Sequence, residues 1–229
     1  MADVLTIDFH THWSCQGKSD IPPEVLMIIS TPLAEINTIQ PDSTRRTLEL
    51  HPWQGESYTS GFEKAAESPE IIGIGEAGLD RLRGALPLDE QLDIFRKTAL
   101  LAEKLQKPLT VHCVKCFSEL LAVNKELRLT IPLIVHYFRG SIEQAKQLWQ
   151  HKNIVLSLPP AIYTRTDVLD FLRNNPEYLK RIVLETDDPE NGDIVQHYHR
   201  IADLLKLEMQ TLQKLMMQQF ELIYGKRIS

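Results

Sequence analysis

Short apolar runs alternate with amphipathic stretches along most of the chain. Eight of these runs are bounded by Gly, Pro or polar residues, and their length and composition predict β-strands. The predicted strands are Val4 to Phe9, Val25 to Ser30, Thr47 to Leu50, Ile71 to Ile74, Leu109 to Val111, Leu133 to Val135, Ile154 to Leu158 and Ile182 to Leu184. Strands so short and so apolar are typical of a parallel sheet that is covered on both faces.

Helical patterns lie between the predicted strands. The clearest runs from Leu88 to Gln106, where apolar residues recur at three- and four-residue steps. Residues 13–24 contain Gly17, Pro22 and Pro23 without a helical period, so the first crossover helix is expected to be missing. Further helices are expected at Ser118 to Leu127, Ile142 to His151 and Asp167 to Asn174, followed by two closing helices that stop at Gly225.

This alternation predicts the α/β class and, with eight strands, a (β/α)₈ TIM-type barrel. At 229 residues the chain is slightly smaller than the roughly 250 residues typical of such barrels. Residues 1–229 are expected to form a single domain. An open doubly wound sheet is the main alternative, although the chain lacks a Gly-rich phosphate loop after its first strand.

Composition and charge narrow the setting and the partners. A net charge of −6 argues against coating a long stretch of duplex, but it leaves room for gripping one phosphate or one strand end. The three cysteines, Cys15, Cys113 and Cys116, are too few and odd in number for a disulfide framework, so reduced thiols are expected and no structural zinc site. With no leader pattern and no apolar run of roughly 18 residues, we expect a cytoplasmic location and no membrane partner.

Ligand-type side chains collect at the ends of the predicted strands, where functional groups gather in either architecture. His10 and His12 are two residues apart, so an extended chain turns both to one side. A single histidine is more often held by a structural hydrogen bond, but five of the eight stand at strand ends, which favours a metal site. The full set is His10, His12, His51, Glu76, His112, His136, Glu185 and Asp187, whereas His151, His197 and His199 are expected to be solvated.

Several of these segments together resemble the motifs of TatD-type metal-dependent hydrolases. They are His10-Thr11-His12, residues 74–80 (IGEAGLD), Val111-His112, residues 136–141 (HYFRGS) and residues 184–189 (LETDDP). The resemblance implies an amidohydrolase-like barrel with two divalent ions, either Zn, Mn or Mg. It also implies the ligands: His10, His12 and Asp187 for one ion, His112 and His136 for the other, and Glu76 bridging both.

The expected chemistry is hydrolysis by a water held between two ions roughly 4 Å apart. Asp187 and Glu76 are the candidate catalytic residues, with Asp187 beside the water as proton acceptor. Glu185 is interpreted as orienting a histidine, with a structural ion pair as the alternative. The candidate substrate-binding residues are His51, Lys115, Arg139 and Arg165, each of which follows a strand end and could hold a phosphate oxygen unless it is only solvated.

The leading hypothesis is phosphodiester hydrolysis at the end of a DNA strand, with a small phosphodiester as a further substrate class and no stable protein partner. The pocket walls depart from the family pattern at Val114, Arg139 and Asp188, which bears on nuclease activity more than on hydrolysis. Two alternatives therefore stay open. One is an amidohydrolase or esterase acting on a small carbonyl substrate, and the other is a non-catalytic barrel that binds a ligand or a protein.

Overall fold

Eight parallel strands form the centre of the protein. A computed structural model describes residues 5–12, 21–38, 42–188 and 192–225. The strands follow one another around a single sheet in chain order, each paired with the next in parallel. Their bounds are β1 Thr6–Thr11, β2 Val25–Pro32, β3 Thr44–Leu50, β4 Ile71–Asp80, β5 Leu109–Val114, β6 Leu133–Val135, β7 Ile154–Leu158 and β8 Ile182–Leu184.

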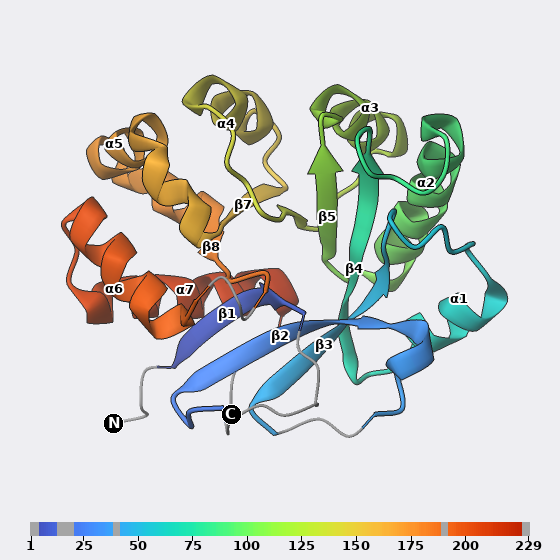
Figure 1. Ribbon diagram of the computed structural model, residues 1–229, viewed down its shortest axis with the longest axis horizontal. Helices are drawn as coiled ribbons and strands as arrows, with labels where there is room; N and C mark the ends of the chain where they lie inside the picture. Colours follow the sequence, from blue (N-terminus) through green and yellow to red (C-terminus); the bar gives the residue numbers. More distant parts are fainter. Residues whose placement is uncertain (1–4, 13–20, 39–41, 189–191, 226–229) are drawn as a thin grey trace.

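Helices lie on the outer side of the sheet, as Figure 1 shows for the arc from α2 to α6 around the strands. Seven α-helices occur in the described residues: α1 Ser60–Ala66, α2 Leu88–Leu105, α3 Phe117–Leu127, α4 Ile142–Trp149, α5 Thr166–Asn174, α6 Ile194–Leu205 and α7 Met209–Tyr224. The described residues also contain three short 3₁₀ segments, η1 Leu33–Glu35, η2 Pro160–Thr164 and η3 Pro176–Arg181. None of the described helices has the length and apolarity that crossing a membrane requires.

The sheet closes where β1 meets the end of β8. Thr11 bridges to Asp187 in parallel, and the amide of His12 donates to the Asp187 carbonyl at 2.8 Å. Beneath this bridge, the carboxylate of Asp8 accepts from both the hydroxyl and the amide of Thr186, at 2.5 and 3.0 Å. The strand order and this closure confirm the (β/α)₈ barrel and exclude the open doubly wound sheet.

β1 divides its side chains between an apolar outer face and a polar inner face. All six of its residues are buried, and alternate side chains point to opposite faces. Phe9 packs against Phe220 of α7 with ring centroids 6.5 Å apart, so this face meets the helix layer. Asp8 and His10 turn the other way, toward the barrel interior. The apolar face therefore anchors the strand, while the inner face is left for polar side chains near its carboxyl end.

The structure corrects several predicted boundaries. β1, β2, β4 and β5 extend beyond the predicted ends, and β4 continues six residues past Ile74 to Asp80. β3 begins at Thr44, three residues before its predicted start. Helix α1 was not predicted, yet Thr59 caps its first turn by accepting from the Phe62 amide at 3.2 Å. The expected absence of the first crossover helix falls largely on residues 13–20, which lie outside the described residues.

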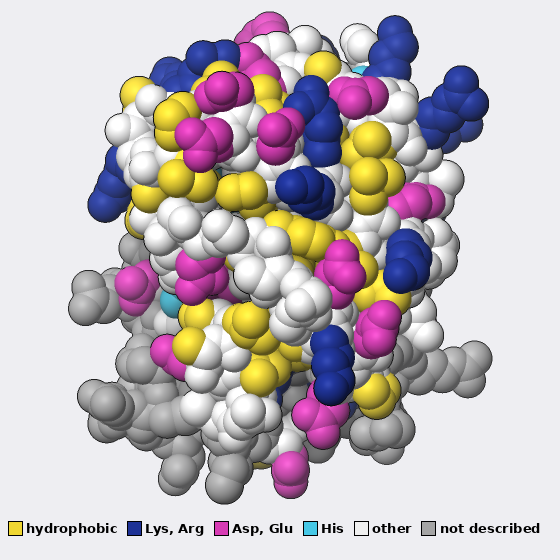
Figure 2. Space-filling view, turned by 90° about the vertical axis from the view of Figure 1, so that its right-hand side faces the viewer, with side chains coloured by type: hydrophobic (Ala, Val, Ile, Leu, Met, Phe, Trp, Pro, Cys, Tyr) yellow, Lys and Arg dark blue, Asp and Glu magenta, His cyan; other side chains and the backbone are white. Residues whose placement is uncertain are grey.

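The face of the protein that carries α1 and α2 has no broad area of a single charge among its described residues (Figure 2). Figure 2 shows the face that carries α1 and α2, where acidic and basic side chains are interspersed with apolar ones. Such a mixed surface fits the modest net charge of −6. Any attraction for an anionic partner on this face therefore depends on particular side chains.

Candidate metal centre

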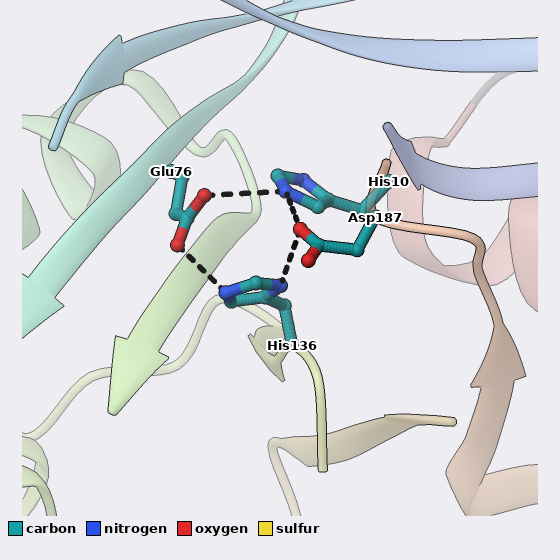
Figure 3. Close-up of side chains that lie close together, drawn as sticks. All are labelled: His10, Glu76, His136 and Asp187. Atoms are coloured by element: carbon teal, nitrogen blue, oxygen red, sulfur yellow. Dashed lines mark ion pairs between the residues drawn. The ribbon is translucent and has the colours of Figure 1, made fainter. Parts of the chain in front are cut away.

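Imidazoles and carboxylates converge at the carboxyl ends of the strands. His10 lies in β1, His112 in β5, and His136 directly follows β6, while Asp187 forms the bridge that closes the barrel. Glu76 comes from the middle of β4 and is almost fully buried. Four of these side chains form a ring, which Figure 3 shows: His10, Glu76, His136 and Asp187.

The two oxygens of Glu76 face different groups of histidines. Oε2 lies 3.2 Å from Nε2 of His10 and 3.0 Å from Nε2 of His12. Oε1 lies 2.5 Å from Nδ1 of His112 and 2.6 Å from Nε2 of His136. One buried carboxylate thus stands between two pairs of imidazoles, which is the position required of a bridging ligand.

Close backbone packing sets the position of this carboxylate. The Glu76 amide donates to the Ser30 hydroxyl at 2.9 Å, which links β4 to β2 across the intervening strand β3. Gly78 pairs with His112 across β4 and β5, and a Cβ at Gly78 would overlap the carbonyl oxygen of His112. Glycine is therefore required for β5 to approach β4 and bring His112 to Glu76.

A carboxylate lies behind three of the histidines. Nε2 of His112 is 3.0 Å from Oδ2 of Asp80, and Nδ1 of His12 is 3.5 Å from Glu49. Nδ1 of His136 is 3.6 Å from Oε1 of Glu185, which is fully buried. Carboxylates in this position orient the imidazoles that ligate metals and raise their basicity. An orienting position was predicted for Glu185, but no role was predicted for Asp80 or Glu49, although both lie at even spacing from a ligand-type residue.

The partners of the ring nitrogens bear on where the protons lie. Both nitrogens of His112 face carboxylate oxygens, Nε2 facing Oδ2 of Asp80 and Nδ1 facing Oε1 of Glu76, and when Nδ1 gives up its proton to serve as a ligand, the proton on Nε2 donates to Asp80. In His51 the proton lies on Nε2, because Nδ1 accepts a hydrogen bond from the Trp53 amide at 3.1 Å. Nε2 of His51 is then a donor toward Glu76, 3.1 Å away. His112 can therefore take the tautomer of a metal ligand, with Asp80 accepting its proton, whereas His51 has that of a hydrogen-bond donor.

The centre holds a buried carboxylate surrounded by imidazoles. Among the described residues, both ring nitrogens of His10 and Nδ1 of His136 are buried without a hydrogen-bond partner. Burial alone would raise the pKa of Glu76, but the surrounding histidines, His136 first, hold that pKa well below its ordinary value. Burial opposes protonation of His136, yet the Glu76 carboxylate raises its pKa well above the usual range. The ionised Glu76 carboxylate thus holds protons on the imidazoles around it, and a divalent cation bound between them can replace those protons.

Grouping the ligand-type side chains by distance alone gives two sets that differ from the two ligand sets that the resemblance implies. One group that could hold an ion contains the four residues of Figure 3, and a second contains His51, Glu76 and His112. His12 belongs to neither group, and its side chain is 38% exposed at the edge of the centre. Because His51 is a donor toward Glu76, the two Glu76 oxygens divide the ligand-type histidines into His10 with His12 and His112 with His136.

The other predicted substrate residues have different surroundings. Lys115 and Arg139 are exposed, and the Arg139 guanidinium lies 5.6 Å from the centroid of the Tyr137 ring. Arg165 makes two hydrogen bonds to Asp167, at 3.0 and 2.7 Å, so its guanidinium is already engaged.

The expectation that His197 is solvated was wrong. This residue is buried in α6, where Nε2 lies 2.8 Å from the Leu158 carbonyl and Nδ1 lies 2.6 Å from the Tyr163 hydroxyl. Both ring nitrogens thus find partners, which allows an imidazole to occupy the core face of a helix. His199 is exposed, as expected, and Cys113 and Cys116 are free thiols, while Cys15 lies outside the described residues.

Known proteins share both this fold and these sequence features. The family model "TatD related DNase" matches residues 28–225. Over 131 residues the chain is 34% identical to the 3'-5' ssDNA/RNA exonuclease TatD of Erwinia billingiae, covering 52% of this chain and 50% of that protein. Over 145 residues it is 28% identical to the human 3'-5' RNA nuclease TATDN2, covering 60% of this chain and 18% of that protein.

The chain thus spans about half the length of the first of these relatives and less of the second. Among solved structures, the TatD homologue YJJV from Escherichia coli superposes with a TM-score of 0.77 and 19% identity, over 99% of this chain and 100% of that one. That likeness supports the barrel fold independently of the sequence motifs. With a family model that matches most of its length, this chain belongs to the TatD-related DNase family.

Proposed function

We propose that this protein is a divalent-metal-dependent hydrolase that cleaves phosphodiester bonds at the end of a single-stranded nucleic acid. The observation that carries the proposal is the buried Glu76 carboxylate between two pairs of imidazoles. Membership of a DNase family supports a phosphodiester as the bond, and the ssDNA/RNA exonuclease activity named for the Erwinia relative supports a single-stranded substrate.

The donor set fits two ions. His10, His12, Asp187 and Oε2 of Glu76 would hold one of them, and the second would lie between Oε1 of Glu76 and the rings of His112 and His136. Imidazole and carboxylate donors suit Zn²⁺ or Mn²⁺ better than Mg²⁺, which favours sites made of oxygen ligands and water. The fit rests on the buried ring nitrogens of His10 and His136 that have no hydrogen-bond partner in the part of the chain that the structure describes.

Bound ions would supply positive charge for the phosphoryl oxygens and a more acidic water. Asp187 is the residue suited to accept a proton from that water, because its carboxylate is 24% exposed and lies 3.6 Å from His10 and 3.8 Å from His136. Burial raises the pKa of Asp187, which strengthens it as a base relative to a solvated carboxylate. His51, whose Nε2–H faces Oε1 of Glu76 at 3.1 Å, is suited to donate to a substrate oxygen bound beside that carboxylate.

The test is hydrolysis of end-labelled single-stranded DNA and RNA by protein loaded with Mn²⁺ or Zn²⁺. We expect stepwise shortening from one end, and no cleavage of a circular single strand. Asp187→Asn and Glu76→Gln should abolish hydrolysis while the circular dichroism spectrum stays native. Asp203→Asn, an exposed change on α6 with the same loss of charge, serves as the matched control.

The same preparation distinguishes the alternatives. Carboxyl ester, amide and lactone substrates measured beside the phosphodiesters would identify a carbonyl hydrolase. Metal analysis addresses the non-catalytic barrel, for which no ion should load. If metal-loaded protein releases nothing from DNA, RNA or simple phosphodiesters, the nuclease proposal fails.

A further inference from the structure

An exposed tryptophan borders the candidate metal centre. The Trp53 side chain belongs to the loop after β3 and is 41% exposed, which is unusual for so large an apolar ring. Its ring centroid lies 4.8 Å from that of His51 and 5.4 Å from that of His112. The indole Nε1–H donates to Oδ2 of Asp80 at 2.6 Å, which fixes the ring in its place. A flat aromatic surface is thus held rigidly next to the histidines of the centre.

A guanidinium lies against this ring. Cζ of Arg83, on the loop after β4, is 3.9 Å from the Trp53 ring centroid. Oδ1 of Asp80 accepts from the Leu82 and Arg83 amides at 2.7 and 2.9 Å, so the carboxylate that holds the indole also holds this loop. Arg83 is exposed and forms no ion pair within the described part of the chain, whereas Arg81 on the same loop pairs with Glu119.

We propose that Trp53 and Arg83 form a stacking platform for the nucleotide next to the scissile phosphate of a single strand. A guanidinium stacked on an indole can accept a base on its outer face, while its in-plane N–H groups donate to a phosphate. Bases in a duplex have no free face, so the platform selects single strands and frayed ends. The proposal rests on the proposed phosphodiesterase function. It adds a binding feature by which the protein would distinguish a nucleic acid strand from a small phosphodiester.

Two observations favour a nucleic acid over an apolar partner at this position. The platform offers one cation and one aromatic face rather than a continuous apolar surface, and that pairing suits a base attached to a phosphate. Lys115, on the loop after β5, is exposed and adds a second positive charge at this end of the barrel. The nearby anionic side chain, Asp80, is buried beneath the indole and already accepts four hydrogen bonds.

The test compares strand and small-substrate hydrolysis in the metal-loaded protein. Arg83→Ala should lower the ratio of kcat/KM for a short oligothymidylate to that for bis-p-nitrophenyl phosphate by about tenfold, the order expected when one stacked base is lost. Arg83→Lys keeps the charge but not the plane and should recover only part of this ratio. Arg128→Ala is the matched control, because Arg128 is an exposed arginine at the end of α3, on the opposite side of the barrel from the centre.

Binding supplies a readout that does not depend on turnover. In a Trp13→Phe background, a phosphorothioate oligothymidylate should quench tryptophan fluorescence, and much less so when Trp53 is also changed to Phe, because the remaining Trp149 is buried in the core. An Arg83→Ala protein with an unchanged substrate ratio and unchanged quenching would overturn the platform while leaving the nuclease proposal intact. Hydrolysis of the small diester without binding or cleavage of any strand would overturn both. Failure to hydrolyse either substrate would overturn only the proposed function if strand binding still depended on Arg83.

Discussion

Asp80 offers the sharpest test of how the candidate metal centre is assembled. Its carboxylate is buried and accepts four hydrogen bonds, two at each oxygen. Oδ1 receives the amides of Leu82 and Arg83, and Oδ2 receives Nε1 of Trp53 at 2.6 Å and Nε2 of His112 at 3.0 Å. Burial alone would raise the pKa of Asp80, but these donors lower it to about 2, so the group stays ionised at any pH used for an assay.

Asp80→Asn retains the shape and changes one acceptor into a donor. The asparagine oxygen can keep the two backbone amides, which leaves its NH₂ group facing the N–H groups of Trp53 and His112. His112 can relieve this conflict by moving its proton from Nε2 to Nδ1, and Nδ1 is the atom 2.5 Å from Glu76. A proton on Nδ1 occupies the lone pair that a metal would need. We expect metal affinity to fall by about 10- to 100-fold, equivalent to about 1.4 to 2.7 kcal/mol.

The assay is competition with a chelator at pH 7.5, with bound Zn²⁺ or Mn²⁺ measured at equilibrium. Asp89→Asn is the control, because Asp89 is an exposed residue in the first turn of α2 and the change in charge is identical. Thermal unfolding of the two metal-free variants shows whether the fold is retained. If Asp80→Asn binds metal within twofold of both the wild type and Asp89→Asn, then Asp80 does not determine the tautomer of His112.

Three further changes test the fold around the centre. Tyr198→Phe should cost about 1 to 3 kcal/mol in urea unfolding, because the buried hydroxyl donates to the Ile7 carbonyl at 2.8 Å and accepts from its amide at 3.2 Å. Burial lowers the pKa of His197 from 6.5 to about 4. Below pH 6.5 the unfolded chain therefore binds a proton that the folded chain does not bind. The free energy of unfolding should fall by about 2 kcal/mol as the pH falls from 7 to 5. His197→Gln should remove that loss, and an unchanged pH slope would contradict the assignment. Gly78→Ala should cost about 1 to 3 kcal/mol and weaken metal binding, whereas Gly61→Ala, whose added Cβ meets only ordinary contacts, should be neutral or slightly stabilising.

The predicted strands were found because their burial leaves a clear sequence signal. Apolar residues on both faces mark a strand such as Ile154–Leu158 whatever surrounds it. The same rule ended the fourth predicted strand at Ile74, where the run turns polar. The strand continues to Asp80 because Glu76 and Asp80 face the barrel interior, where the site requires polar groups. Strand prediction by apolar runs therefore fails first at the residues that build a site.

The prediction that His197 is solvated was wrong for a related reason, although the sequence carried a signal of its burial. Ile194, His197, Tyr198 and Ile201 recur at three- and four-residue steps and are all buried on one face of α6. That spacing places the histidine on the core face. An imidazole is tolerated there because the Leu158 carbonyl at the end of β7 and the Tyr163 hydroxyl satisfy its two nitrogens. Periodicity could have predicted the burial, but the two partners depend on how η2 packs against α6.

The orienting carboxylates show most clearly where inference from one sequence stops. Glu49 on β3 reaches His12 at the end of β1, and Glu185 after β8 reaches His136 after β6, so each crosses an intervening strand. In both cases that strand supplies a serine hydroxyl that donates to the carboxylate: Ser30 of β2 at 2.9 Å to Glu49, and Ser157 of β7 at 2.5 Å to Glu185.

A small polar residue on the middle strand leaves room for the longer glutamate to pass, and its hydroxyl offsets part of the cost of burying the charge. Each such arrangement therefore depends on the register of three strands at once. A ligand-type residue at a strand end can be recognised from its own strand. The carboxylate that orients it is determined by which residues the barrel places side by side.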